Sequence, residues 1–353
     1  MPTPAGVIHG SARWASWERG PWLHSKRWDL CFLTFSGVLV IIPLILYELI
    51  GNSAMVINLV VAGLIGGPHM YATFFRTTFD RSFRQRHRFV VLSSCAIPGL
   101  VVFFALWNFQ LLVTMFFFWA SIHVLHQIAY IMECYERKQG TPVLGWSQLI
   151  DYAVVFSCLF PVATYKFIYD QFYISSTLLL FPTFLKTHVV FYAITGFFVA
   201  SLLLFLGKTL VEMRQGTAHY PKILLIVITV GLALLMTSYN GPKLEIAFQG
   251  FNTWHSFQYL ALTWYITLLR RQRGEVDSGM MRWLAQRDQG HFRYFYGLNL
   301  ALTLVALVLI GAVTTYSNVG FERGYYIVVL SFLLIHYYHD HILFTQYGDL
   351  VEL

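Results

Sequence analysis

Ten stretches of roughly 20 apolar residues run through this 353-residue chain, and each is long enough to cross the hydrocarbon core of a bilayer as a helix. The composition agrees, because only 12% of the residues are charged, against about 25% in an ordinary soluble domain. The sequence therefore predicts an all-α integral membrane protein, a polytopic bundle of about ten transmembrane helices, and excludes a water-soluble globule. We expect the helices at 30–49, 54–75, 89–107, 109–131, 150–169, 187–210, 221–238, 245–268, 295–316 and 325–345.

Basic residues concentrate in alternate loops, and this pattern predicts the orientation of the helices. Loops rich in Lys and Arg stay on the cytoplasmic side of a membrane. With ten spans, every basic cluster falls on the same side. We therefore expect both termini to be cytoplasmic, in a multi-pass protein of a bacterial inner membrane. The clusters are Arg13, Arg19, Lys26 and Arg27; Arg76, Arg81, Arg84, Arg86 and Arg88; Arg137 and Lys138; Lys208, Arg214 and Lys222; and Arg270, Arg271, Arg273, Arg282, Arg287 and Arg293.

We expect one transmembrane helical domain over 1–353, because no linker is long or polar enough to separate a second domain. The segment 1–29 is expected to be cytoplasmic and has no short apolar core before a cleavage site, so we expect no cleaved signal peptide. The basic cytoplasmic loop 269–294 contains Met281 and Trp283, which suits a short helix on anionic lipid as well as it suits a solvated connector. These loops account for the net charge of +7, so we expect no nucleic-acid partner.

Eight of the 13 histidines of the chain lie in or beside four of the predicted helices. Ionisable residues inside a membrane are costly and usually face the bundle interior for a functional reason. A single membrane histidine is typically a hydrogen-bond partner between helices, so the prediction depends on the whole set. All four helices run from outside to inside, which places their histidines at similar depths. We expect one intramembrane metal site formed by His69, His123, His126, His255, His336, His339 and Asp340.

The residue types in this set favour iron. Imidazole binds zinc, copper, iron and nickel, and a carboxylate shifts the preference toward iron or manganese. His123 and His126 are three residues apart and share a helix face, and His336, His339 and Asp340 share another. Seven groups are enough for two non-haem irons, which we favour over one. A single ion would use four groups and leave the others as hydrogen-bond partners.

Four short patches resemble a known family of membrane enzymes. They are G-G-P-H at 66–69, S-I-H at 121–123, W-H-S at 254–256 and I-H at 335–336. On these residues the chain resembles the bacteriorhodopsin-related-protein family of membrane β-carotene 15,15′-dioxygenases, which are non-haem iron enzymes made of transmembrane helices. The resemblance implies that His69, His123 and His255 match iron ligands. It also implies that His336 matches a fourth histidine patch, whereas Tyr259 stands where the family pattern has a further histidine.

The function predicted from these residues is a membrane-embedded iron oxidase or oxygenase, of oxygenase, hydroxylase or desaturase type. Its expected partners are O₂, a membrane lipid or other hydrophobic small molecule that enters from the bilayer, and a cytoplasmic electron donor where the reaction needs one. Tyr130, Tyr259 and Tyr337 are candidates to supply a proton beside the metal. Two alternatives stay open. Histidines are also axial ligands of b-type haem in electron-transfer proteins, and polar groups at mid-membrane also occur in metal and proton transporters.

Overall fold

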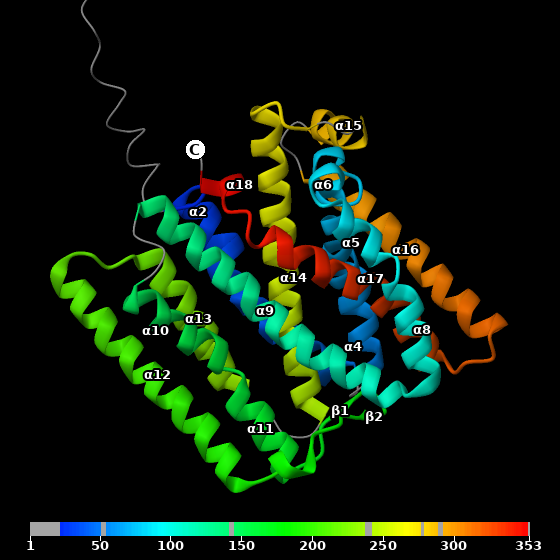
Figure 1. The fold of residues 1–353 in the computed structure, drawn as a ribbon, viewed down its shortest axis with the longest axis horizontal. Coiled ribbons are helices and arrows are strands. Elements are labelled where there is room, and N and C mark those ends of the chain that lie inside the picture. The colour runs from blue at the N-terminus through cyan, green and yellow to red at the C-terminus, as the bar shows by residue number, and fades with distance from the viewer. Residues whose placement is uncertain are drawn as a thin grey trace, which may run out of the picture.

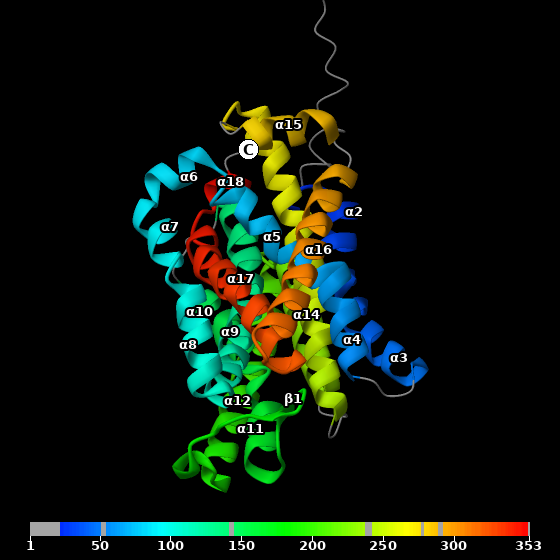
Figure 2. The same ribbon diagram turned by 90° about the vertical axis from the view of Figure 1, so that its right-hand side faces the viewer.

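The fold is a bundle of long helices with a two-stranded hairpin at one end and the short helix α15 at the other (Figure 1, Figure 2). Most of the described residues are helical, as expected in a bilayer, where each backbone group must find its hydrogen-bond partner within the protein. The structure is a computed structural model, and it describes residues 22–50, 54–140, 145–236, 242–276, 279–288 and 292–351.

In the first part of the chain, π-helical turns interrupt two long helices. Lys26–Leu49 combines four elements, and Val56–Arg76 is continuous through a π-helical stretch that precedes Pro68. Such bulges add one residue to a turn and are frequent at functional sites. The elements are α2 (Lys26–Asp29), η1 (Leu30–Thr34), η2 (Phe35–Ile41), α3 (Ile42–Leu49), α4 (Ala54–Val61), η3 (Ala62–Gly66), α5 (Gly67–Arg76), α6 (Arg81–Arg86), α7 (Arg88–Ser94), α8 (Ile97–Trp107) and α9 (Phe109–Gln139).

The described residues after α9 include a small hairpin, in which Tyr173 pairs with Leu178 in antiparallel register. All the other regular elements among these residues are helices. The elements are α10 (Trp146–Ser157), α11 (Phe160–Tyr169), β1 (Tyr173–Ile174), β2 (Thr177–Leu178), η4 (Thr183–Leu185), α12 (His188–Gln215), α13 (Tyr220–Leu235), α14 (Pro242–Gln272), α15 (Gly279–Asp288), α16 (Arg293–Tyr316), α17 (Phe321–Leu343) and α18 (Gly348–Val351).

Eight helices in the described part of the chain are long and apolar enough to cross a membrane, and they coincide with eight of the ten predicted spans. The other two predicted spans correspond to the helices α13 and α14 over the residues that the structure describes. However, α13 has 16 residues, and α14, with 31 residues, carries many polar side chains. α14 lies in the centre of the bundle, where polar side chains face protein rather than lipid (Figure 1). The count of ten spans and the cytoplasmic location of both termini stay predictions.

Two long helices extend beyond the apolar stretches that predicted them. α9 continues to Gln139, past the predicted end at residue 131, and α12 continues to Gln215, past residue 210. Each ends at a glycine with a positive φ, 74° at Gly140 and 71° at Gly216, the conformation that terminates many helices. Hydropathy therefore marks the membrane part of a helix, whereas the capping glycine marks its end.

Glycines allow close packing around the two helices that carry the G-G-P-H and W-H-S motifs. A Cβ atom at Gly250 would lie 2.2 Å from the Val40 carbonyl oxygen, so α14 approaches η2 backbone to backbone. A Cβ at Gly67 would lie 2.4 Å from Thr303 Cγ2, where α5 meets α16. Small residues commonly permit such contacts between membrane helices. The predicted basic loop 269–294 contains α15, which lies across one end of the bundle (Figure 2).

Candidate metal centre

Four helices each bring one histidine to the centre of the bundle. They are His69 on α5, His123 on α9, His255 on α14 and His336 on α17. Each is at most 4% exposed, and ring centroids of contacting pairs lie 4.7 to 5.2 Å apart. Asp340, one helical turn after His336, is fully buried beside them. We call these five residues the histidine–aspartate centre.

Two overlapping groups in the centre have atoms close enough to hold a metal ion. One is His69, His255 and His336, and the other is His123, His336 and Asp340; within each group the candidate ligand atoms lie within 4.8 Å of one another. Asp340 Oδ2 is 3.5 Å from His336 Nδ1 and 3.8 Å from His123 Nε2. The second group is therefore a set of two histidines and one carboxylate.

The atoms that a metal would use have no hydrogen-bond partner in the described part of the protein. These atoms are the Nε2 of His69, His123, His255 and His336, and Oδ2 of Asp340. Buried polar atoms in proteins nearly always form hydrogen bonds, and each one left unsatisfied costs about 1–3 kcal/mol. Five such atoms on neighbouring buried side chains are difficult to explain by helix packing and are what a metal site requires.

Hydrogen bonds on the far side of the centre determine which atoms face inward. Thr73 Oγ1 donates to Asp340 Oδ1 at 3.0 Å, and Tyr259 OH donates to the same oxygen at 2.7 Å. His336 Nδ1 lies 2.5 Å from Thr73 Oγ1. Because the threonine has given its single proton to Asp340, the Nδ1–H of His336 must donate to it. This leaves Nε2 of His336 and Oδ2 of Asp340 free to act as ligands, as expected when outer hydrogen bonds orient a metal site.

The π-helical segment η3 prepares His69 in the same way. His69 Nδ1 lies 2.5 Å from the Gly66 carbonyl oxygen, so Nδ1 carries the proton and Nε2 keeps its lone pair. Pro68 has no N–H, which removes a helical partner from a carbonyl one turn earlier. Tyr296 OH donates to the carbonyl of Leu64, four residues before Pro68, at 2.5 Å. The motif G-G-P-H thus forms a local bend that directs one imidazole nitrogen into the centre.

Two predicted ligands, His126 and His339, lie outside the centre. The ring of His126 lies 5.5 Å from that of His341 and is partly exposed. His339 Nδ1 lies 3.0 Å from Thr77 Oγ1, on another side of α17. Side chains three residues apart differ in direction by about 60° on an α-helix, so a narrow site receives only one of the two. The expectation of seven converging groups is therefore reduced to five.

The three predicted tyrosines occupy different positions. Tyr259 belongs to the hydrogen-bond network through its bond to Asp340. Tyr337 is buried, with its ring centroid 4.2 Å from that of His123. Tyr130 stacks on Phe344 at 5.2 Å, and Phe344 in turn lies 5.7 Å from His123, so the tyrosine is one ring away from the centre.

Sequence reasoning did not identify Thr73 and Ser256 as site residues. Thr73 is the hub of the hydrogen-bond network, and Ser256 Oγ lies 3.0 Å from His69 Nδ1. Both had a signal in the sequence, since Thr73 follows His69 by one helical turn and Ser256 is the serine of the W-H-S motif. A hydroxyl next to a predicted ligand on the same helix is a reasonable candidate for its outer hydrogen-bond partner.

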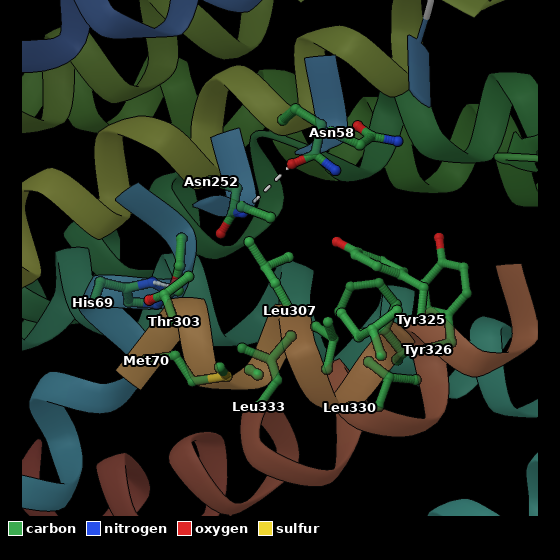
Figure 3. A pocket seen from close by; sticks show the side chains of 18 of the residues that line it. Asn58, His69, Met70, Asn252, Thr303, Leu307, Tyr325, Tyr326, Leu330 and Leu333 are labelled. Atoms are coloured by element: carbon green, nitrogen blue, oxygen red, sulfur yellow. Dashed lines mark hydrogen bonds between the residues drawn. The ribbon is translucent and has the colours of Figure 1, made fainter. Parts of the chain in front are cut away.

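A largely apolar cavity reaches the centre at His69 (Figure 3). Met70, Leu307 and Leu333 form one side, and Asn58 is among the polar residues on the other. The cavity lies between the helices of the 54–76 segment, α14, α16 and α17. The histidine–aspartate centre is therefore in contact with a space suited to an apolar molecule.

No protein-family model, curated protein or solved structure matches this chain. The resemblance to the membrane carotene dioxygenases therefore stays a prediction from four short patches, and function is argued below from the geometry of the centre.

Proposed function

We propose that this protein is a membrane-embedded non-haem iron oxidoreductase that uses O₂ to oxidise a lipid-soluble substrate. The observation that carries the proposal is the group of His123, His336 and Asp340, with its unpaired lone pairs. Two histidines and one carboxylate with open positions are typical of non-haem iron oxygenases. The apolar cavity that ends at His69 supplies the place for a substrate from the bilayer.

One metal ion fits the centre better than two. The two candidate groups share His336, and a neutral imidazole whose Nδ1–H is donated to Thr73 has a single lone pair to offer. With His126 and His339 outside the centre, five residues remain rather than seven, in two groups that overlap at His336. We therefore propose a mononuclear iron in place of the dinuclear site that the sequence favours.

The protein residues have separable tasks in such a reaction. Thr73 and Tyr259 hold the carboxylate of Asp340, and the buried helices exclude water. When bound, iron supplies the electron chemistry that lets O₂ react with an organic molecule. Cleavage of a carbon–carbon double bond places both oxygen atoms in two carbonyl products and needs no outside electrons. Hydroxylation of a C–H bond inserts one oxygen atom and reduces the other to water, whereas desaturation removes two hydrogen atoms from the substrate and reduces both oxygen atoms to water. Each of these reactions needs two further electrons and two protons from a cytoplasmic donor.

Ring packing in the centre argues for iron without a porphyrin. A b-type haem would place a flat macrocycle between two axial histidines. Here each imidazole contacts others at centroid distances of 4.7 to 5.2 Å and at steep angles, from 67° to 88°. Such an arrangement leaves no slot for a macrocycle and suits a bare ion surrounded by nitrogen atoms.

Elemental analysis of the purified protein, together with an optical spectrum, tests the proposal. We expect about one iron per chain and no Soret band, and His123→Ala and His336→Ala should each lose the metal. His126→Ala is the matched control, because it removes a histidine from the same helix as His123 but outside the centre. A Soret band, zinc in place of iron, or iron retained in both centre variants would refute the proposal. Loss of iron in His126→Ala would restore the dinuclear site.

A further inference from the structure

The cavity that ends at His69 has a second polar layer at its other end. Asn58, Glu245 and Tyr326 line it, and they precede His69, His255 and His336 by 11, 10 and 10 residues. At 1.5 Å of rise per residue, this spacing separates the two layers by about 15 Å. The three helices run in the same general direction through the bundle, so the residues form a layer rather than scattered sites (Figure 1).

The second layer is rich in hydrogen-bonding atoms. Asn58 Nδ2 donates to Glu245 Oε1 at 3.0 Å, and the backbone N–H of Ser175 donates to the same oxygen at 3.1 Å. Asn58 Oδ1 is buried and has no hydrogen-bond partner among the described residues. The hydroxyls of Tyr325 and Tyr326 lie at the end of the cavity away from His69 (Figure 3). Donors and acceptors are therefore available at one place.

Apolar side chains form one wall between the two polar layers, and Gln249 and Asn252 add amide groups to the lining. Met70, Leu307, Leu330 and Leu333 lie along this wall in Figure 3. The separation of about 15 Å is half of the roughly 30 Å hydrocarbon core of a bilayer, so the cavity matches the depth of about one leaflet. A molecule that fills it has an apolar body of that length and one polar end.

We propose that the cavity binds a neutral amphiphile, a long apolar chain with a hydroxyl group at one end. The hydroxyl lies against Asn58, Glu245 and Tyr326, and the chain extends to His69. This inference rests on the proposed function, because it names the substrate class of the same centre. The far end of the chain, not the hydroxyl, is the part presented for oxidation.

The chemistry of Glu245 favours a hydroxyl over other head groups. Glu245 is the charged residue among the described residues that line the cavity, so a carboxylate or phosphate head group would meet a like charge. An ammonium would form a buried ion pair, whose desolvation is costly. A hydroxyl can donate to a carboxylate or accept from a carboxylic acid, and it also matches the amide of Asn58.

Photo-crosslinking in lipid nanodiscs tests this assignment. The probes are a diazirine-bearing long-chain alcohol and the matching hydrocarbon, carboxylic acid and amine, and labelled peptides are mapped by mass spectrometry. We expect saturable labelling of cavity residues by the alcohol alone. Glu245→Met should weaken it at least about tenfold, and Tyr326→Phe about threefold. Glu322→Met is the matched control, since Glu322 accepts a hydrogen bond from the same hairpin, at Ser176, but does not line the cavity.

Equal saturable labelling by the hydrocarbon, stronger labelling by the acid or the amine, or unchanged alcohol binding in Glu245→Met and Tyr326→Phe would overturn the inference. Tyr326→Phe protects the test against a folding defect, because it removes a single oxygen atom. The metal content of the same preparations separates the two proposals. Iron without alcohol binding refutes the substrate class alone, whereas alcohol binding in a protein that takes up no iron refutes the proposed function and leaves the amphiphile site standing.

Discussion

Two of the buried polar clusters in the described part of the bundle differ in whether their groups satisfy one another. In the first, which we call the lysine–carboxylate cluster, four helices meet through charges of opposite sign. Lys222 on α13 lies 2.7 Å from both Glu136 on α9 and Asp151 on α10, and Lys208 on α12 lies 2.5 Å from Asp151. Each cation therefore has an anion in direct contact.

The histidine–aspartate centre has the opposite character. Its five residues are equally buried, but their inward atoms have no hydrogen-bond partner in the described part of the protein. A cluster whose charges neutralise one another fixes how helices pack. A cluster that directs several lone pairs at one point is incomplete without a cation. Burial of polar residues is thus a poor sign of function in itself, and the informative feature is the set of unpaired atoms.

The variant His255→Ala tests most directly whether the histidine–aspartate centre binds a metal ion. Removal of this ring, whose two nitrogens both have no partner among the described residues, should abolish metal binding while the protein still folds, because no hydrogen bond is lost. Metal content and thermal unfolding with and without a chelator provide the measurement. The chelator should lower the unfolding temperature of the wild type and leave that of the variant unchanged. An equal effect of the chelator on both proteins would show that His255 is not a ligand.

The lysine–carboxylate cluster should respond in the reverse way. Asp151→Asn leaves Lys208 and Lys222 each with one buried anion fewer, and breaking such a pair costs about 3–5 kcal/mol of unfolding free energy. Metal content per folded chain should not change. Glu275→Gln is the control, because its ion pair with Arg270 is long, at 3.8 Å, and the carboxylate is 46% exposed, so less than about 1 kcal/mol is expected. Similar losses of unfolding free energy in Asp151→Asn and Glu275→Gln would show that the buried ion pairs of the lysine–carboxylate cluster do not stabilise the fold more than an exposed pair does.

Hydropathy and helical spacing predicted much of this architecture, and the reasons for the failures are physical. Of the ten spans that the apolar stretches predicted, eight coincide with long apolar helices in the described part of the chain, because burial in lipid leaves a strong local signal. α14 was predicted as a span despite its polar residues and lies in the centre of the bundle. Sequence spacing placed His126 and His339 beside true members of the centre, since a helix face is broader than a metal site. Which of two neighbours points inward depends on helix rotation, a tertiary property.

Acidification should distinguish the clusters through His219, the residue before α13, which lies beside the lysine–carboxylate cluster. Burial, and next the charge of Lys222, lower the pKa of His219 from 6.5 to about 4. Between these values the folded protein keeps the imidazole neutral while the unfolded chain binds a proton, so stability decreases as the pH falls from about 6.5 to about 4. The loss approaches roughly 3 kcal/mol.

Urea or thermal unfolding at several pH values measures how steeply the unfolding free energy decreases with pH. The variant His219→Asn should lose the part of this decrease that is due to His219. Asparagine keeps an acceptor for the N–H of Lys222, so the start of α13 stays capped. Metal release on acidification should be the same in the variant and in the wild type, because metal binding depends on neutral imidazoles in the other cluster. If the stability of the variant depends on pH as steeply as that of the wild type, the titrating group is a residue other than His219.

The smallest expected effect concerns the outer hydrogen bonds of the histidine–aspartate centre. Thr73→Val removes the hydroxyl that receives the His336 proton and holds Asp340, without removing any ligand. Loss of such an outer partner typically lowers metal affinity 10- to 100-fold. Thr73→Ser keeps the hydroxyl and should stay close to the wild type, and competition with a chelator of known affinity measures both. If serine and valine weaken binding equally, Thr73 contributes through packing, and the single proton of this hydroxyl does not set which imidazole nitrogen faces the metal.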